Sequence, residues 1–358
     1  STPMPEKNLK GIPASDGIAI GPVFCYIPTE LTIPVCAAGG VDEEMARFAT
    51  ARERARVELQ GLYEAVEKRA GKEEASIFEA HQEMLSDPAL EGKIREFVEV
   101  GQTAEQALVM ATEELANLLA GMEDELFAAR ALDVKDVGRR ILRILLGLPD
   151  TALSAVTEPS IIIAEDLTPS DTASLDPALT HGFITAQGGL TSHSAILART
   201  LGLPAIVGMG NGLLDKVSSG TFIVMDGRTG EMIIEPDQET IARYKQIKTQ
   251  RESHLLILKA AAEKDAVTAN GRRVEVAANV GEAASARDAM EHGAEGIGLL
   301  RTEFLYLEDA QPPSEEKQYH IYREIFEVMS GRPVIVRTLD IGGDKPPSYM
   351  PFPDEMNP

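Results

Sequence analysis

The sequence contains little cysteine and no long apolar run. Only Cys25 and Cys36 occur among its 358 residues, and their spacing fits no metal-binding motif. Two thiols in so long a chain are typical of a reducing compartment. A membrane-spanning helix needs a run of about 18 apolar residues, which this chain lacks, and its N-terminus carries no signal-peptide pattern. These absences predict a cytoplasmic protein that does not bind to membranes.

Positive charge is also scarce. The chain has 34 Lys and Arg residues against 57 Asp and Glu residues, so its formal net charge is −23. Such a charge argues against binding to nucleic acid or to anionic membrane surfaces, because both repel an acidic protein. It suits an acidic surface that meets a basic partner.

The residue pattern changes twice along the chain, from strand-like to helical and back. Residues 11–26 show a strand pattern with regular glycines, and from residue 149 to 236 short apolar strands alternate with short helices. Between these parts, proline occurs only as Pro88, and apolar residues recur at helical spacing. Five helices are predicted there, at about 42–70, 73–85, 88–100, 103–120 and 124–147. The helical block is therefore expected to be an insertion in an α/β domain.

The last part of the chain alternates strands and helices again. Strands are predicted at 272–280, 296–300 and 333–340, with helices between them. This alternation predicts parallel strands and right-handed crossovers, as in a (β/α)8 barrel, which needs about 250 residues. Because three strands cannot close a barrel, we expect the chain to be a fragment of a longer protein. The predicted fold is α/β multidomain, with an α/β domain (1–30 and 149–236), a helical insert (31–148), a linker helix (237–268) and a partial barrel (269–358).

One histidine has a distinctive setting, in the segment GGLTSHSAILART at residues 188–200. Thr191 or Ser192 can cap the helix that follows, which places His193 in its first turn. The free N–H groups and the helix dipole there favour anions and disfavour a protonated ring, so a neutral imidazole could attack a phosphorus atom. On local features alone, a histidine that only packs or caps is the more common case, because a Gly-Gly pair is a weak signal. The other five histidines, His81, His181, His254, His292 and His320, read as structural or surface residues.

Several further motifs accompany this histidine. Residues 188–199 read G-G-x-T-S-H-x-A-I-x-A-R. The others are GIPASDGIAIGP (11–22), IFEAHQEMLSDPAL (77–90), DLTPSDTA (166–173), GIGLLRTEFLY (296–306) and VRTLDIGGDK (336–345). In their order along the chain, these motifs resemble those of the enzyme I family of the bacterial phosphoenolpyruvate:sugar phosphotransferase system. The resemblance extends over the whole chain.

This resemblance implies a swivelling phosphohistidine α/β domain, an inserted all-α domain that binds the carrier protein HPr, and the first part of a phosphoenolpyruvate-binding (β/α)8 barrel. It implies that His193 takes a phosphoryl group from phosphoenolpyruvate and passes it to a histidine of HPr. Thr172 matches a threonine that hydrogen-bonds the ring. Arg301 and Arg337 match arginines that clamp the substrate phosphate and carboxylate, since a guanidinium fork suits paired oxygens.

Lesser roles follow from the same resemblance. Asp340 and Lys345 could support the substrate site, and Asp344 ranks below them. Mg²⁺ is implied as the cofactor, with no ligand in this chain and its ligands beyond Pro358. A homodimer would form through the full-length C-terminal barrel. The residues that match the HPr-binding region are Ile77, His81, Met84, Leu85 and Arg130.

Alternatives remain for both the partner surface and the function. The stripe that includes Ile77, Phe78 and Leu85 has helical spacing, so it fits the core of a helical bundle as well as a surface. The same fold could serve a nitrogen-type regulatory phosphorelay. Pyruvate phosphate dikinase and phosphoenolpyruvate synthase share similar motifs, but they place an ATP-binding domain before the histidine domain, which this chain enters directly.

Overall fold

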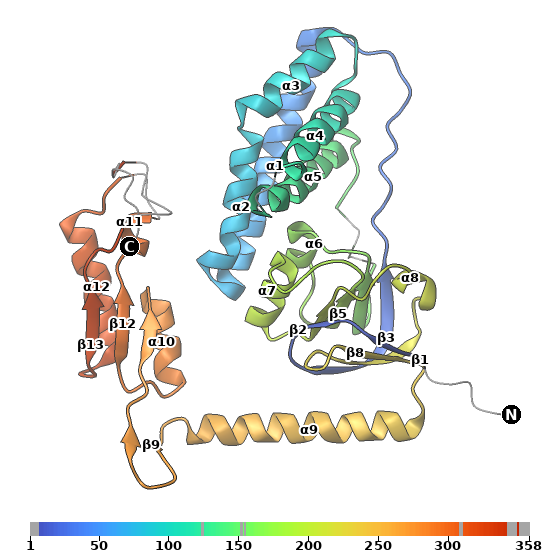
Figure 1. Cartoon of the computed structure of the whole chain (residues 1–358). Coiled ribbons are helices and arrows are strands. Elements are labelled where there is room, and N and C mark those ends of the chain that lie inside the picture. The colour runs from blue at the N-terminus through green and yellow to red at the C-terminus, as the bar shows by residue number, and fades with distance from the viewer. Residues whose placement is uncertain are drawn as a thin grey trace, which may run out of the picture. The chain divides into compact units, whose positions relative to one another are not determined.

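The computed structural model describes residues 7–122, 125–150, 153, 155–307, 311–341 and 349–350. The chain forms two compact units, Ser1–Lys248 and Thr249–Pro358, and the division falls within helix α9 (Gln238–Ala261). Figure 1 shows the elements of both units. The finer division into four parts stays a prediction from the sequence. Among the described residues, no helix combines the length and apolarity that a membrane span needs.

An eight-stranded mixed sheet forms the base of the first unit (Figure 1). Its order is β1-β8-β7-β3-β4-β5-β6-β2. The strands are β1 (Lys7–Lys10), β2 (Ile12–Ser15), β3 (Ile18–Tyr26), β4 (Ser160–Ala164), β5 (Thr180–Thr185), β6 (Ala205–Val207), β7 (Phe222–Asp226) and β8 (Glu231–Ile234). Strands β3 to β6 run parallel, and the other four join antiparallel. The N-terminal strand β3 pairs with β4 and β7, which confirms that it belongs to this α/β sheet.

Both faces of the sheet are buried, as the apolar run of β4 requires. Ile161 and Ile163 enter one core cluster, whereas Ile162 and Ala164 enter another, because successive strand side chains point to opposite faces. The connecting helices are α6 (Pro169–Ala173), α7 (His193–Leu201) and α8 (Leu213–Lys216). Helix α7 buries Ala195 in the second of these clusters.

A block of five helices lies between β3 and β4 in the chain. These are α1 (Val41–Ala70), α2 (Lys72–Leu85), α3 (Pro88–Glu99), α4 (Ala104–Ala120) and α5 (Glu125–Leu145). All five were predicted, with bounds that agree within about two residues, and local signals mark the starts of α3 and α4. Asp87 caps α3 with Pro88 in its first turn, and Thr103 and Gln106 form a capping box on α4.

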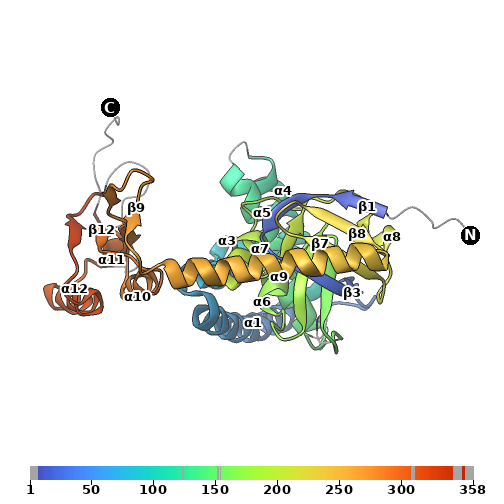
Figure 2. The same cartoon turned by 90° about the horizontal axis from the view of Figure 1, so that it is seen from below.

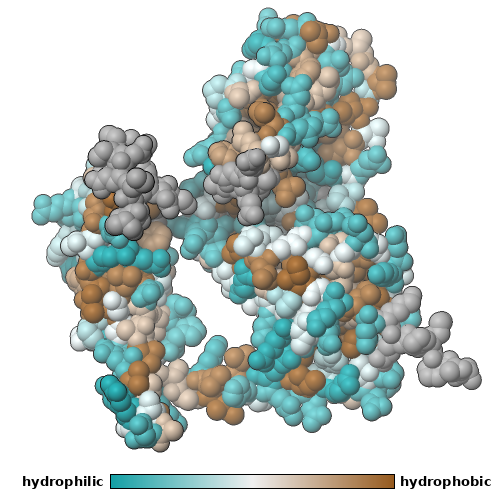
Figure 3. Space-filling view, in the orientation of Figure 1, coloured by the Kyte–Doolittle hydropathy of each residue, from teal (hydrophilic) through white to brown (hydrophobic). Residues whose placement is uncertain are grey.

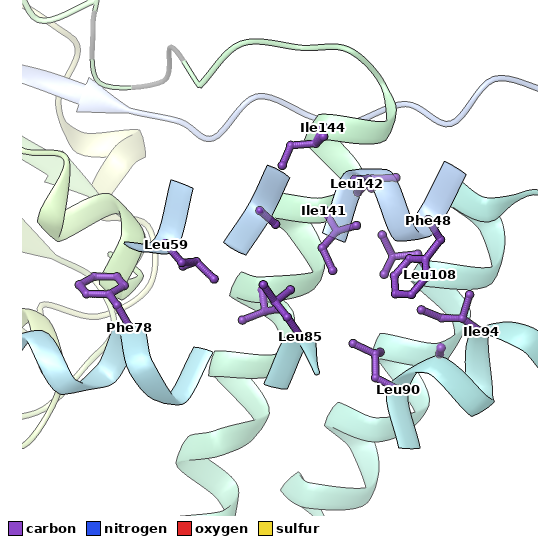
Figure 4. Packing of buried hydrophobic residues seen from close by; sticks show 14 of the residues in the cluster. Phe48, Leu59, Phe78, Leu85, Leu90, Ile94, Leu108, Ile141, Leu142 and Ile144 are labelled. Atoms are coloured by element: carbon purple, nitrogen blue, oxygen red, sulfur yellow. The ribbon is translucent and has the colours of Figure 1, made fainter. Parts of the chain in front are cut away.

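The helical block shares its core with the α/β part of the same unit. Phe48, Phe78 and Leu108 are fully buried in this core (Figure 4), which also includes Leu197 of α7. Arg69 near the end of α1 donates a 2.9 Å hydrogen bond to the carbonyl of Ala173, the last residue of α6. The helices that carry the functional motifs are therefore held against α1 and α2 by both apolar and polar contacts.

The second unit contains a parallel sheet of three strands in the order β11-β12-β13, as the alternation of elements predicted. Helices α10 and α12 lie together on one side of it (Figure 2). The elements are β9 (Ala266–Val267), β10 (Arg273–Val274), β11 (Ala278–Val280), α10 (Ala283–Glu291), β12 (Ile297–Arg301), α11 (Phe304–Leu307), α12 (Glu315–Met329) and β13 (Val334–Arg337).

The single strand predicted at 272–280 was wrong. The chain there forms two short strands, and β10 pairs with β9 in a hairpin while β11 pairs with β12. Between them, the amide of Val276 donates to the Glu295 carboxylate at 2.7 Å instead of continuing a ladder. The apolar residues of 272–280 give no sign of this change of partner, because Val274 and Val276 lie on either side of it and both remain about half exposed.

Candidate functional site

His193 is the first residue of α7, at the end of the loop that follows β5. Ser192 has an extended backbone, and its hydroxyl accepts a hydrogen bond from the amide of Ala195. Gly188, at the start of this loop, has a φ of +95°, which favours glycine because a side chain there would be strained. The sequence predicted this helix start, and the structure identifies Ser192 as the cap.

The ring of His193 lies against α2 of the helical block. Its Nε2 atom is 3.3 Å from the backbone carbonyl oxygen of Glu74. A carbonyl can only accept, so Nε2 carries the proton and the lone pair is on Nδ1. Nδ1 is buried and has no hydrogen-bond partner among the described residues. The ring of Phe78 meets the imidazole edge-on, with 6.2 Å between centroids.

The ring is neutral near pH 7. Burial lowers the pKa of His193 below its ordinary value of 6.5, and the neighbouring His81 lowers this pKa further, while the carbonyl of Glu74 raises it. The sequence predicted a neutral ring from the helix dipole. The direction is confirmed, but the largest cause is desolvation, which the sequence alone does not reveal.

The depressed pKa of His193 predicts that acid weakens the docked arrangement, in which the His193 ring lies against α2. The unfolded chain, with an ordinary histidine pKa, binds more protons than the folded chain as the pH falls below 6.5. The contribution of this ring to stability is therefore present above pH 6.5 and lost as the pH falls through the folded-state pKa. An NMR titration of the His193 ring should give a midpoint below 6.5, and a midpoint at or above 6.5 would contradict the burial described here.

The segment 166–173 contains α6 (Pro169–Ala173), which contacts α7. Thr168 and Asp171 make a capping box at its start. The Thr172 side chain is buried, and its hydroxyl donates to the backbone carbonyl of Thr168 at 2.9 Å. The expected hydrogen bond from Thr172 to His193 is thus replaced by two others, because the threonine bonds to its own helix and the imidazole bonds to Glu74.

The expected partner-binding residues fall into two groups. His81 and Leu85 are buried, with exposed fractions of 0% and 2%, so in this structure they do not form a surface. The physical reason is that this face of α2 packs against the bundle, where His81 bonds to Asp133 of α5 at 3.0 Å. Ile77 and Met84 are half-buried, and Arg130 is exposed.

The two arginines of the second unit lie next to each other. Arg301 ends β12 and Arg337 ends β13, and the strand register pairs them directly. Arg301 is exposed, with its guanidinium 5.3 Å from the centre of the Phe304 ring. Arg337 forms a salt bridge of 2.8 Å with Glu303, which the sequence analysis missed because nothing in a single sequence pairs these two residues.

The other residues predicted to support the site at Arg301 and Arg337 form no metal-binding group among the described residues. Asp340 lies 3.5 Å from Arg337, so this carboxylate and that of Glu303 both face the same guanidinium. Lys345 and Asp344 lie outside the described residues. Within the described ranges, no group of three or more His, Cys, Asp or Glu side chains could hold a metal ion. The residues at hand therefore do not fit a magnesium site.

Comparisons with known proteins find related proteins and family models along most of the chain. Family models match the N-terminal part of phosphoenolpyruvate-utilising enzymes at residues 10–130, their mobile domain at 156–230 and their phosphoenolpyruvate-binding domain at 257–358. The phosphoenolpyruvate-protein phosphotransferase of Staphylococcus carnosus is 41% identical, over 98% of this chain and 61% of that protein. The corresponding protein of Priestia megaterium is 40% identical, over 98% of this chain and 61% of that protein.

A solved structure is similar over about two thirds of this chain. An NMR structure of enzyme I (nEIt) is 41% identical, with a TM-score of 0.56, over 68% of this chain and 99% of that one. The chain spans about three fifths of the length of the curated relatives that it matches.

Proposed function

This chain belongs to the phosphoenolpyruvate-protein phosphotransferase family, also called enzyme I, and on that premise we propose that His193 carries a phosphoryl group from phosphoenolpyruvate to the carrier protein HPr. The observation that carries this proposal is the setting of His193, a neutral imidazole in the first turn of α7. The free N–H groups of that turn and the helix dipole favour the phosphoryl group that the ring would acquire.

Transfer requires the ring to leave α2. Nε2 holds the proton that bonds to Glu74, and Nδ1 is buried, so neither nitrogen is open to a phosphorus atom in the docked arrangement. Once the ring is released and a nitrogen lone pair is free, a P–N bond forms as the bond between phosphorus and the donor breaks. Such transfers depend on positioning and on the stabilisation of charge.

We assign the phosphoenolpyruvate end of the reaction to the second unit. Arg301 and Arg337 provide paired donors at the carboxyl ends of neighbouring parallel strands, which is where barrel enzymes hold their substrates. Three parallel strands fit the first part of a (β/α)8 barrel. The full-length protein would form a homodimer through the complete barrel. Mg²⁺ would neutralise phosphate charge in this step, and we place its ligands outside the described residues.

The helical block is the proposed docking site of HPr. Arg130 is exposed, and Ile77 and Met84 are partly accessible on α2. Hydrophilic side chains cover much of the visible face of the block in Figure 3. A protein with a net charge of −23 is complementary to a carrier that is basic around its histidine. His81 and Leu85 are left out of this surface because they are buried.

Charge complementarity predicts that docking weakens with salt. The Debye length falls from about 30 Å at 0.01 M to about 8 Å at 0.15 M ionic strength, so steering by the acidic surface is screened. We expect the association rate with HPr, measured by stopped-flow fluorescence, to fall by about tenfold over this range. A rate that stays flat would contradict an electrostatic docking surface.

The function is tested by transfer in both directions. The chain should take labelled phosphate from phosphorylated HPr and return it to unlabelled HPr. Comparing sugar-type with nitrogen-type HPr decides between the two phosphorelays, because the faster carrier identifies the physiological class. Absence of exchange with either carrier would contradict the proposed function.

A further inference from the structure

We propose that a cluster of two buried residues, His81 and Asp136, and the half-buried Asp133 positions His193 in its docked, shielded orientation; the importance of this orientation rests on the proposed function of His193. The cluster lies on α2 and α5 and bonds to α6, and both α2 and α6 contact α7. Its members do not touch the reacting nitrogen, so they act as positioning residues.

His81 and His193 differ from the other histidines of the chain in their burial. Four of the six, His181, His254, His292 and His320, are exposed. His81 is fully buried, His193 is half-buried, and the ring of Phe78 stands edge-on to both, with centroids 5.8 Å and 6.2 Å away. Their Nδ1 atoms are two of the three buried side-chain nitrogen and oxygen atoms without a hydrogen-bond partner in the described part of the chain. Such atoms are costly, so their presence needs an explanation.

The first link of the cluster ties α2 to α5. His81 Nε2 lies 3.0 Å from Asp133 Oδ1, and because an ionised carboxylate only accepts, the imidazole is the donor. Its other nitrogen, Nδ1, is 4.0 Å from Asp136 Oδ2, which is too long for a hydrogen bond. A hydrogen bond to a charged acceptor is stronger than a neutral one, so this partly buried link holds α2 against α5.

The second link ties α5 to α6. The buried Asp136 carboxylate accepts hydrogen bonds from the Ser170 hydroxyl at 2.8 Å and from the Ser170 amide at 3.3 Å. Ser170 lies in the first turn of α6, two residues before Thr172. The second link therefore joins the helical block to the α/β part, whereas the first link holds α2 within the helical block.

These links explain why the ring is docked. With α2 held by Asp133, the Glu74 carbonyl and the Phe78 ring stand where the imidazole of His193 meets them. With α6 held by Asp136, the two parts of the first unit stay together at this point. Loosening the cluster should release the ring and expose its lone pair, so the cluster sets the balance between a shielded and a reactive histidine.

Histidine acylation by diethyl pyrocarbonate tests this inference without any phosphoryl transfer. The reagent needs an accessible, unprotonated ring nitrogen, and mass spectrometry gives the rate for each histidine. In the wild-type chain, at pH 7, His193 should react about tenfold more slowly than His292 and His320, whose side chains are both 64% exposed. If His193 reacts as fast as these two, the docked orientation is not the solution state and the proposal fails.

Variants of α2 then separate positioning from general packing. His81→Leu removes the donor to Asp133 and should raise the His193 rate about tenfold. His81→Gln offers an amide donor in place of Nε2 and should restore slow acylation. Gln82→Leu is the matched control, because Gln82 is a half-buried neighbour on α2 that bonds only to Gln60 among the described residues. Its rate should equal that of the wild type.

A change on the α/β side covers the case in which His81→Leu does not fold. Ser170→Ala removes the 2.8 Å bond to Asp136 without touching the helical core, and it should raise the His193 rate about threefold.

The ¹⁵N shifts of the His193 ring should report a protonated Nε2 in the wild type and in His81→Gln, and a mixture of tautomers in the two loosened variants, His81→Leu and Ser170→Ala. If every folded variant keeps the wild-type rate and tautomer, the proposal is overturned. Slow acylation of a chain that exchanges no phosphate with HPr would overturn the proposed function alone.

Discussion

Replacing His193 by alanine should abolish labelling of the chain by phosphorylated HPr. The imidazole is the proposed nucleophile, and alanine offers no atom that can form a P–N bond. Loss of a nucleophile costs many orders of magnitude in other enzymes, so we expect at least about a thousandfold decrease, to the background of the assay. The side chain is only half-buried, and the variant should remain folded with a similar circular dichroism spectrum.

The matched control is His320→Ala. His320 is an exposed histidine on α12, where it pairs with Glu316 of the same helix. This variant should be labelled at the wild-type rate. If the His193→Ala chain still acquires an acid-labile phosphoryl group at a comparable rate, the nucleophile has been assigned to the wrong residue.

The Phe78→Ala variant should lose about 3–5 kcal/mol of unfolding free energy. The Phe78 side chain is fully buried in the core of the helical block, and its ring also stands edge-on to the imidazoles of His81 and His193. Removing it leaves a cavity and takes away the apolar surface that His193 meets. Urea unfolding followed by circular dichroism should show a lower midpoint with a similar slope.

Phe97→Ala provides the comparison for this loss. Phe97 of α3 packs against the same core but is only partly buried. Its removal should cost clearly less than that of Phe78, because less apolar surface leaves a buried site. Equal losses for the two variants would show that the packing around Phe78 is not as tight as described.

Local signals made much of the first unit predictable. The Asp87-Pro88 pair and the Thr103 capping box mark helix starts that depend on neighbouring residues only. The same holds for Ser192, which placed His193 in the first turn of α7. Such features are encoded within a few positions of the chain, so a single sequence reveals them.

Tertiary contacts explain what the sequence could not reveal. His81 and Leu85 share a helical stripe that fits a core or a docking surface equally well, and only the packing of α2 against α1 and α5 decides that they are buried. The partner of the His193 ring is a backbone carbonyl, that of Glu74, which any residue at that position would offer. The separation of β10 from β11 likewise depends on Glu295, which is distant in sequence from both strands.

The central claim is that one phosphoryl group resides on His193 and passes reversibly to HPr. Its most direct test is to equilibrate the wild-type chain with phosphorylated HPr at alkaline pH, where phosphohistidine is stable, and to locate the phosphoryl group by peptide mass spectrometry. We expect a single modified site, in the peptide that carries residues 188–199, which loses its label when unlabelled HPr is added. A phosphoryl group on any other residue, or one that HPr cannot remove, would contradict it.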